Sequence, residues 1–327
     1  MQRFVAAPFF DPPSDALRFL PEGPRVLRNC PGNNGKLGWV AIQHGADLLE
    51  GSINILDLAS QRNQSFPLPG RPGFFAETTR PGVLLVGLER DLILFDLATS
   101  RVEKLGVHVT DDDRVIINDG LAVEGGVLFG TKHLEFNQPI AALYYFDAAR
   151  RSVHTVLDGQ ICSNGKFLTR DTAGATLVDI DSIPKTIARY RLDATLKSII
   201  ERALIVAPDS LPASPDGLRP SPIEEVEVEP QSIVVAFYNG AEVVDGLAQL
   251  IRLRDGATLA EWTIPGAPRV TCPEFVEIDG KVKILFTTAL EGMPESLRRR
   301  ASGSGCLYIA DTPFSKMPEP PPLVDLQ

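Results

Sequence analysis

The chain has 327 residues, of which 44% are hydrophobic and 23% are charged, a balance typical of globular proteins. Its net charge of −10 argues against nucleic acid as a main partner, because phosphate binding requires a basic surface. No run of about 18 apolar residues occurs, so no transmembrane helix is expected.

The N-terminal stretch and the cysteines bear on the cellular compartment. The first apolar patch is interrupted by Asp11 and two prolines, too early for the core of a secretory signal. Four cysteines are far apart and form no CxxC pair, so free buried thiols are expected rather than a zinc site; they are Cys30, Cys162, Cys272 and Cys306. We therefore expect a cytoplasmic protein with no membrane partner.

Short β-strands dominate the chain. Segments rich in Val, Ile, Leu, Phe and Tyr are bounded by Gly, Pro, Asp or Asn, which is the pattern of strands joined by turns. No helical period extends over about a dozen residues, and the candidate helices are Pro294–Arg300 and Leu196–Ala203. The predicted strands are Arg25–Leu27, Gly38–Ile42, Ser52–Asp57, Val83–Leu88, Leu92–Asp96, Leu121–Val123, Val127–Gly130, Ala142–Asp147, Ser152–Leu157, Thr176–Asp181, Thr186–Leu192, Ile233–Tyr238, Glu242–Val244, Ala248–Leu253, Thr258–Ile264, Phe275–Ile278, Val282–Phe286 and Gly305–Asp311.

A weak internal repeat groups these strands. An apolar strand that closes on a charged residue recurs, as in ILDL at 55–58, LFDL at 94–97 and YFDA at 145–148. Gaps of roughly 40 to 60 residues between such units are typical of a β-propeller, with about four strands per blade. The repeat count predicts an all-β, six-bladed β-propeller; five or seven blades and a β-sandwich array are the alternatives.

Residues 1–327 are predicted to form a single propeller domain, with about 14 N-terminal and about 10 C-terminal residues peripheral to it. Two internal segments depart from the repeat. Pro208–Pro222 is rich in Pro and Ser and is predicted to be a loop; Ile223–Glu229 alternates with negative charge, as in a solvent-facing strand or a linker. The proline-rich tail Met317–Gln327 is expected on the surface with little order.

The stretch Arg114–His133 (RVIINDGLAVEGGVLFGTKH) is central to the functional prediction. Its Asn-Asp-Gly, at 118–120, is interpreted as a polar corner before a hairpin of two short strands joined by a Gly-Gly turn, because glycine supplies the positive φ that tight turns need. Here the side-chain oxygen of Asn118 can face a cavity as a neutral ligand. An Asx-turn explains the same residues without a ligand.

Three further polar residues precede a glycine in a similar setting: Glu22, Asn164 and Asp216. Each alone is typical of a simple turn. Equivalent corners of propeller blades converge on the central channel, where two carboxylates and two amides make an all-oxygen cage. Such donors suit a hard cation such as calcium, at oxygen distances of about 2.3–2.6 Å.

Five motifs occur in order between Leu20 and Ala310. They are LPEGP at 20–24, NDG at 118–120 with FGT at 129–131, SNG at 163–165 with DIDS at 179–182, PDGL at 215–218 and TCPEF at 271–275. Together they resemble the SMP-30/gluconolactonase/regucalcin-like family. The resemblance implies a six-bladed propeller with one divalent metal ion in its central channel.

The resemblance also implies roles for individual residues. The metal ligands fall on Glu22, Asn164 and Asp216, and Asn118 touches the substrate or a metal-bound water. Glu135 takes the place of an acidic residue that the family has shortly after Gly-Thr. Ca²⁺ is the expected ion, with Zn²⁺, Mg²⁺ and Mn²⁺ as alternatives.

Two positions depart from the family pattern. Ile116 stands where the family often has Arg, and Lys132 stands where it has Met, which brings a long cation next to His133 near the channel mouth. Arg114, two residues before Ile116, is a candidate to reach the cavity. Lys132 and Arg114 join Asn118 and Glu135 as predicted substrate-binding residues, and the changed groups put specificity for a sugar lactone in question.

These observations predict a divalent-metal-dependent hydrolase that opens a small lactone. The cation would polarise the carbonyl group, and Asp216 would be the base that activates the attacking water. The expected partner is a small-molecule substrate, and the protein is expected to be a monomer or small homo-oligomer. The alternatives are hydrolysis of another ester, such as a phosphotriester, at the same site, and a non-enzymatic propeller that binds the cation.

Overall fold

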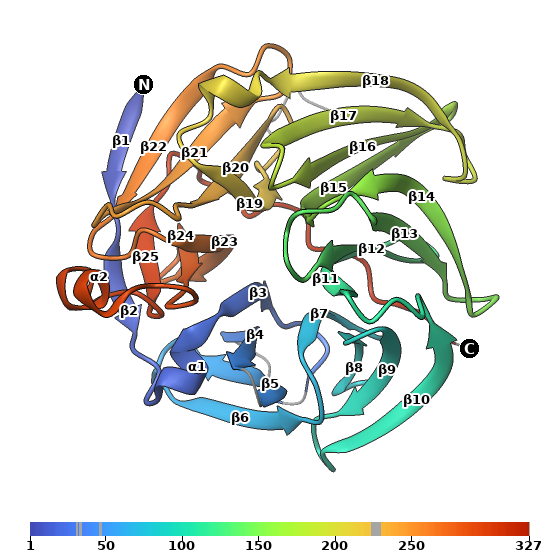
Figure 1. The fold of residues 1–327 in the computed structure, drawn as a ribbon, viewed down its shortest axis with the longest axis horizontal. Coiled ribbons are helices and arrows are strands. Elements are labelled where there is room, and N and C mark those ends of the chain that lie inside the picture. Colours follow the sequence, from blue (N-terminus) through green and yellow to red (C-terminus); the bar gives the residue numbers. More distant parts are fainter. Residues whose placement is uncertain (31, 33–34, 46–47, 224–229, 327) are drawn as a thin grey trace.

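Six small sheets surround a central axis in the computed structural model of the protein (Figure 1). The structure describes residues 1–30, 32, 35–45, 48–223 and 230–326. Each sheet is built from strands that follow one another in the chain, so each sheet is one blade. The fold is therefore a six-bladed β-propeller, which confirms the predicted all-β class.

Within each blade, the main strands lie one after another at increasing distance from the axis, in chain order. The first strand of each blade is therefore the innermost. The blades are, in chain order, β3–β6 (Pro21–Val26, Lys36–Gly45, Leu48–Asp57, Asn63–Leu68), β7–β10 (Pro72–Glu77, Val83–Leu88, Asp91–Asp96, Arg101–His108), β11–β14 (Val115–Val123, Gly126–His133, Ala141–Asp147, Ser152–Gln160), β15–β18 (Ser163–Asp171, Gly174–Asp181, Thr186–Leu192, Ile199–Val206), β19–β22 (Ser214–Pro220, Ser232–Tyr238, Gly246–Arg252, Thr258–Ile264) and β23–β25 (Val270–Ile278, Lys281–Thr288, Leu307–Asp311).

The two N-terminal strands complete the ring. β2 (Ala7–Phe10) pairs antiparallel with β25 and forms the fourth, outer strand of the last blade. β1 (Gln2–Val5) adds a fifth, parallel strand to the neighbouring blade, beside β22. Joining the start of the chain to its last blade closes the circle and leaves no gap between blades.

Helices are short and few in the described residues. They are α1 (Asp15–Phe19), the 3₁₀ turn η1 (Pro208–Ser210) and α2 (Glu295–Arg300). α2 confirms the helix predicted over Pro294–Arg300, whereas α1, which Ser14 caps through Leu17 N, was not predicted. No helix in the described part of the chain is long and apolar enough to cross a membrane.

Two predicted elements are wrong. The helix expected over Leu196–Ala203 is instead the start of β18, where Ile199 and Glu201 pair with Leu192 and Arg191 of β17. The main-chain partners that β17 offers outweigh a weak local helical preference. Glu242–Val244, predicted as a strand, lies in the connection between β20 and β21.

The Pro/Ser-rich segment predicted as a loop contains the innermost strand of a blade. β19 spans Ser214–Pro220 and pairs with β20 alone in its sheet. Proline lacks an N–H donor and is therefore confined to edge strands; β19 is an edge strand that faces the channel, so Pro215 and Pro220 fit there. Of the predicted segment Ile223–Glu229, residues 224–229 lie outside the described residues.

The hydrophobic core is a ring of clusters, each lying between two neighbouring blades. For example, Trp39 packs with Val276 and Leu285 across the junction of the first and last blades. Phe74 and Phe129 stack at a centroid distance of 5.8 Å between the second and third blades. Because each blade is held by apolar side chains on both faces, the innermost strands keep a fixed position around the axis.

The C-terminal tail is better anchored than predicted. Val324 is 1% exposed and forms a parallel bridge with Thr78. Residues 317–322 line a cavity of about 570 Å³ together with Arg25, Lys166 and Arg219. The prolines of the tail reduce the entropy lost on ordering, which favours this extended contact with the propeller.

Candidate functional site

The four X-Gly corners predicted from the sequence are β-bulges. Glu22, Asn118, Asn164 and Asp216 each lie at a break of pairing register in an innermost strand, one in each of four blades. The prediction that they are corners ahead of a strand is therefore wrong, since they lie within strands. A bulge re-aims side chains at the edge of a sheet, and here it directs successive residues of an innermost strand towards the channel.

The glycines next to these residues allow the innermost strands to approach one another. A Cβ on Gly165 would lie 2.4 Å from Leu218 N and 2.8 Å from Asp216 O. A Cβ on Gly217 would lie 2.4 Å from Cys272 Sγ. Both distances are shorter than van der Waals contact, so glycine is needed for the close approach and not for a turn.

Two amides of the site are joined directly. Asn118 Nδ2 donates to Asn164 Oδ1 at 2.9 Å and to Ser163 O at 2.9 Å. Asn164 Nδ2 in turn donates to Ser182 Oγ at 2.8 Å. This relay fixes the orientation of both amides. It uses one lone pair of Asn164 Oδ1 and leaves Asn118 Oδ1 as a further acceptor.

The two carboxylates of the site, Glu22 and Asp216, repel each other. Burial and repulsion from Asp216 and Asp119 raise the pKa of Glu22 well above its usual value. Burial and electrostatic repulsion from Asp119 likewise raise the pKa of Asp216, which is 6% exposed. Within the residues that the structure describes, neither carboxylate accepts a hydrogen bond. Buried carboxylates without donors are costly unless a cation is nearby.

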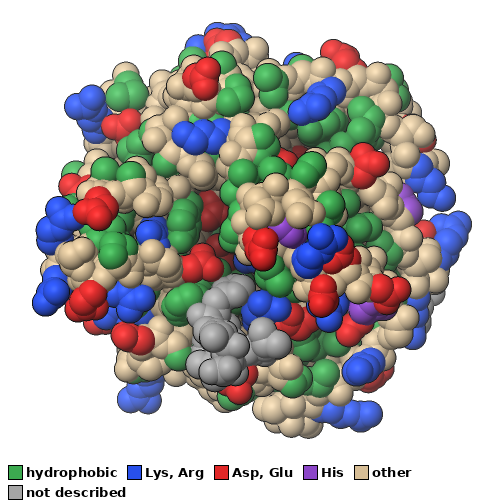
Figure 2. Space-filling view, in the orientation of Figure 1, with side chains coloured by type: hydrophobic (Ala, Val, Ile, Leu, Met, Phe, Trp, Pro, Cys, Tyr) green, Lys and Arg blue, Asp and Glu red, His purple; other side chains and the backbone are tan. Residues whose placement is uncertain are grey.

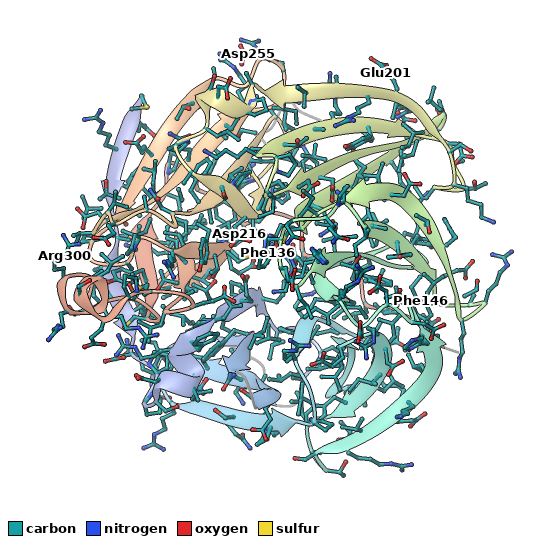
Figure 3. All side chains as sticks on the ribbon, in the orientation of Figure 1. Phe136, Phe146, Glu201, Asp216, Asp255 and Arg300 are labelled. Carbon is teal, nitrogen blue, oxygen red and sulfur yellow. The ribbon has the colours of Figure 1, made fainter. Side chains whose placement is uncertain are left out.

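The donor set fits a hard cation. It consists of two carboxylates, Glu22 and Asp216, which repel each other, and the side-chain oxygens of Asn118 and Asn164, whose amides are hydrogen-bonded to each other. No three His, Cys, Asp or Glu side chains of the described residues could hold a metal ion by themselves, so the amides are needed. Figure 2 shows a hollow with acidic side chains at the centre of this face, and Asp216 lies near the axis in Figure 3.

Lys132 and the following loop form part of the rim. Lys132, the register partner of Ile116, is 5% exposed, and its Nζ lies 5.9 Å from the centre of the Phe136 ring. His133 is fully buried, and its Nδ1 accepts hydrogen bonds from Asn137 N and Gln138 N at 3.3 and 3.2 Å. His133 therefore holds the loop that carries Phe136, which lies near the axis in Figure 3.

Two predicted substrate-binding residues lie further out. Arg114 is half exposed, forms an ion pair with Asp112 at 2.6 Å and donates to Gln138 Oε1 at 3.2 Å. Glu135 is exposed, and its carboxylate accepts a hydrogen bond from Asn137. The structure thus brings together Glu22, Asn118, Asn164, Asp216 and Lys132, and it places Arg114 and Glu135 on the outer part of the rim.

A second, largely basic layer lies below the oxygen donors and was missed from the sequence. Lys166 Nζ donates to Asp119 O at 3.2 Å and lies 3.7 Å from Asp119 Oδ2. Arg219 Nε and Arg25 Nη1 share Glu274 Oε2, at 2.7 and 3.5 Å. Asp119 and Glu274 stand inside quoted motifs, Asn-Asp-Gly and TCPEF, but Asp119 was interpreted as a turn former and Glu274 was given no role.

The segment before β15 is held by buried acids. Asp181 accepts hydrogen bonds from Cys162 N and Ile161 N at 2.9 and 3.1 Å. Asp179, 1% exposed, accepts one from Gln160 Nε2 at 2.6 Å. Burial raises the pKa of Asp179 to about 7, although Lys166 partly opposes the shift.

Replacing Asp179 with Asn is expected to stabilise the protein more at pH 8 than at pH 5. The pKa of Asp179 is about 7 in the folded protein, against an ordinary value of 3.8. Between pH 3.8 and pH 7 the folded state therefore holds a proton that the unfolded state has lost, so the free energy of unfolding falls as pH rises through this window and stays low above pH 7. Asparagine does not titrate, and its amide can donate to Gln160 Oε1, which has no partner in the described chain. The gain in free energy of unfolding should be about 3 kcal/mol larger at pH 8.

Urea unfolding of Asp179→Asn at both pH values measures this difference. Asp158→Asn, on an exposed position of β14, controls for the loss of one negative charge. An equal effect of Asp179→Asn at pH 5 and pH 8 would show that Asp179 titrates normally.

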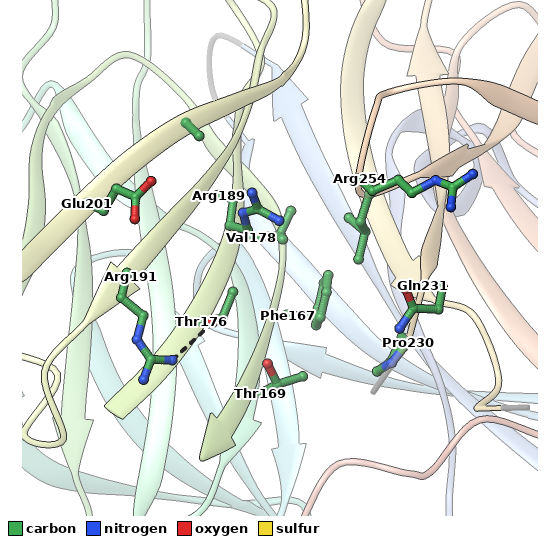
Figure 4. Close-up of a pocket in the computed structure, with 12 residues that line it drawn as sticks. Phe167, Thr169, Thr176, Val178, Arg189, Arg191, Glu201, Pro230, Gln231 and Arg254 are labelled. Carbon is green, nitrogen blue, oxygen red and sulfur yellow. Dashed lines mark hydrogen bonds between the residues drawn. The ribbon is translucent and has the colours of Figure 1, made fainter. Parts of the chain in front are cut away.

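A separate cavity of about 240 Å³ lies between the fourth and fifth blades (Figure 4). Arg189, Arg191 and Arg254 line it, and Arg191 donates to Thr176 Oγ1 at 3.3 Å. None of the predicted site residues lines this cavity. The channel, rather than this cavity, therefore holds the candidate active site.

The fold and the site define a six-bladed propeller with clustered oxygen donors in its channel. The SMP-30/Gluconolactonase/LRE-like region family matches residues 20–290. Because the match covers most of the chain, the protein belongs to this family, as its motifs indicated.

Individual relatives are more distant. The chain is 25% identical over 286 residues to an L-arabinolactonase of Azospirillum brasilense, covering 86% of each protein. A calcium-binding protein, regucalcin, from Agrobacterium tumefaciens superposes with a TM-score of 0.78 at 20% identity, over 99% of both chains. A luciferin-regenerating enzyme superposes with a TM-score of 0.75 at 19% identity, over 93% of this chain and 95% of the enzyme's chain. These structural matches support the fold.

Proposed function

We propose that the protein is a divalent-metal-dependent hydrolase that opens small lactones. The observation that carries the proposal is the pair of carboxylates, Glu22 and Asp216, which lie beside two oriented amides and receive no hydrogen bond from the described residues. Membership of the family and the distant relationship to an L-arabinolactonase support it.

Each residue of the donor set has a proposed task. Glu22, Asn164 and Asp216 hold the ion, with Ca²⁺ favoured because all donors are oxygens. When bound, the ion acts as a Lewis acid on the lactone carbonyl. Asp216 takes a proton from the attacking water through its second oxygen, as a general base. Asn118 orients the substrate.

Removal of the metal ion tests the proposal. Treatment with a chelator is expected to abolish hydrolysis of a five-membered aldonolactone, followed by acid release at constant pH, and added Ca²⁺ should restore it. Circular dichroism should show that the chelated protein remains folded. Equal turnover with and without metal would reject metal-dependent hydrolysis, and no turnover of any lactone or phosphotriester with Ca²⁺ bound would favour a non-enzymatic propeller.

A further inference from the structure

Lys132 is a buried cation for which the described residues supply no ion-pair partner. It is the penultimate residue of β12, and an isolated bridge to Cys162 ties it to the next blade. It is 5% exposed, and across the described part of the chain its ammonium forms no hydrogen bond or ion pair. Its Nζ lies 5.9 Å from the centre of the Phe136 ring, a neutral group that cannot neutralise the charge.

The charge of Lys132 acts on the candidate metal site. It is close enough to Glu22, Asp216 and Cys162 to lower the pKa of all three. Lys166, another cation of this region, is already paired with Asp119. Among the described residues, Lys132 is a positive charge beside the two carboxylates that forms no ion pair.

Occupation of the site by a divalent ion changes the charges beside Lys132. The ion would cancel the two negative charges of Glu22 and Asp216, the carboxylates on which the ammonium of Lys132 acts. Asp119 and Glu291 also act on both carboxylates; Asp119 is paired with Lys166, and Glu291 keeps its negative charge while it accepts a hydrogen bond from the Tyr238 hydroxyl. A buried ammonium that has no hydrogen-bond acceptor among the described residues is costly, so an anionic group on a ligand is a favourable partner for Lys132.

We propose that Lys132 binds a carboxylate on the substrate, so that the preferred substrates are lactones that carry a second, ionised acid group. This inference rests on the proposed lactonase function and names its substrate class. Phe136 packs against the lysine, and His133, through Asn137 N and Gln138 N, holds the loop in place. An ammonium–carboxylate pair formed out of water gives strong discrimination.

Arg269 is the other candidate for an anion at the channel mouth. It is 4% exposed, and its Nε and Nη1 have no partner among the described residues. It stacks on Tyr238 at 5.4 Å and donates to Gly292 O. Lys132 is favoured because its charge acts on both carboxylates that hold the ion.

A matched pair of lactones tests the proposal. One is a neutral aldonolactone, and the other is the same ring with a carboxylate in place of the terminal CH₂OH group. The protein is expected to prefer the carboxylate form. In Lys132→Met, the ratio of kcat/KM for the carboxylate form to kcat/KM for the neutral lactone should fall by about 30-fold or more. Lys132→Arg should keep most of the preference.

A second measurement needs no substrate. Titration of Ca²⁺ into the chelated protein should show tighter binding to Lys132→Met, by about tenfold, since one nearby positive charge is gone. Lys104→Met removes an exposed lysine on β10 and should match the unaltered protein in both experiments.

The outcomes separate the two proposals. If Lys132→Met hydrolyses both lactones and kcat/KM falls equally for the two, or for neither, the role of Lys132 is overturned and the lactonase function is left intact. Unchanged Ca²⁺ affinity in Lys132→Met would also overturn it. Failure of the Ca²⁺-loaded protein to hydrolyse either lactone would instead contradict the proposed function.

Discussion

Replacing Asp216 with Asn is expected to lower kcat/KM for lactone hydrolysis by about 10³-fold and to weaken Ca²⁺ binding. The substitution keeps the size of the side chain but removes one of the two negative charges that face the channel. It also removes the proposed base. Because Asp216 accepts no hydrogen bond in the described chain, the amide should be tolerated by the fold.

Ca²⁺ titration and lactone turnover measure the two effects separately. Asp209→Asn provides the control, since Asp209 is an exposed carboxylate of η1, just before β19. Full activity in Asp216→Asn would assign the base to another group. Full Ca²⁺ affinity would show that the ion lies elsewhere.

Replacing Gly165 with Ala is expected to damage the site without touching any of its donors. The new Cβ would lie 2.4 Å from Leu218 N and 2.8 Å from Asp216 O, both main-chain atoms that cannot rotate away. β15 and β19 must then move apart, which separates Asn164 from Asp216. We expect a loss of about 3 kcal/mol in stability and a large loss of Ca²⁺ affinity.

Thermal unfolding and Ca²⁺ titration test this second prediction. Gly240→Ala is a matched control, because a Cβ at Gly240 meets nothing within 4 Å. If the two variants behave alike, the close approach of the innermost strands does not set the geometry of the site.

Local patterns were sufficient to predict the blades. The apolar strands bounded by Gly, Pro, Asp and Asn correspond to most of the second and third strands of each blade, which are buried on both faces. Prediction failed at the sheet edges. β18 was taken for a helix and β19 for a loop, because an edge strand carries exposed residues or prolines and is defined by the neighbour it pairs with.

The sequence also indicated which residues are candidate oxygen donors. Glu22, Asn118, Asn164 and Asp216 were selected because each is followed within two residues by a glycine in a repeated setting. The reason given for the glycine was wrong, since Gly165 and Gly217 permit contact between blades and do not form turns. That contact joins strands far apart in sequence, so only the folded structure shows it.

The sequence by itself determined the blade repeat and the all-β class and supplied the candidate oxygen donors, because these depend on residue type and on neighbours along the chain. The tertiary structure decided which charges remain unbalanced. It pairs Lys166 with Asp119 and Arg219 with Glu274, leaves Lys132 without an ion-pair partner in the described chain, and places Arg114 and Glu135 on the outer rim. Such pairings depend on distances across the channel between different blades, and no local pattern encodes those distances.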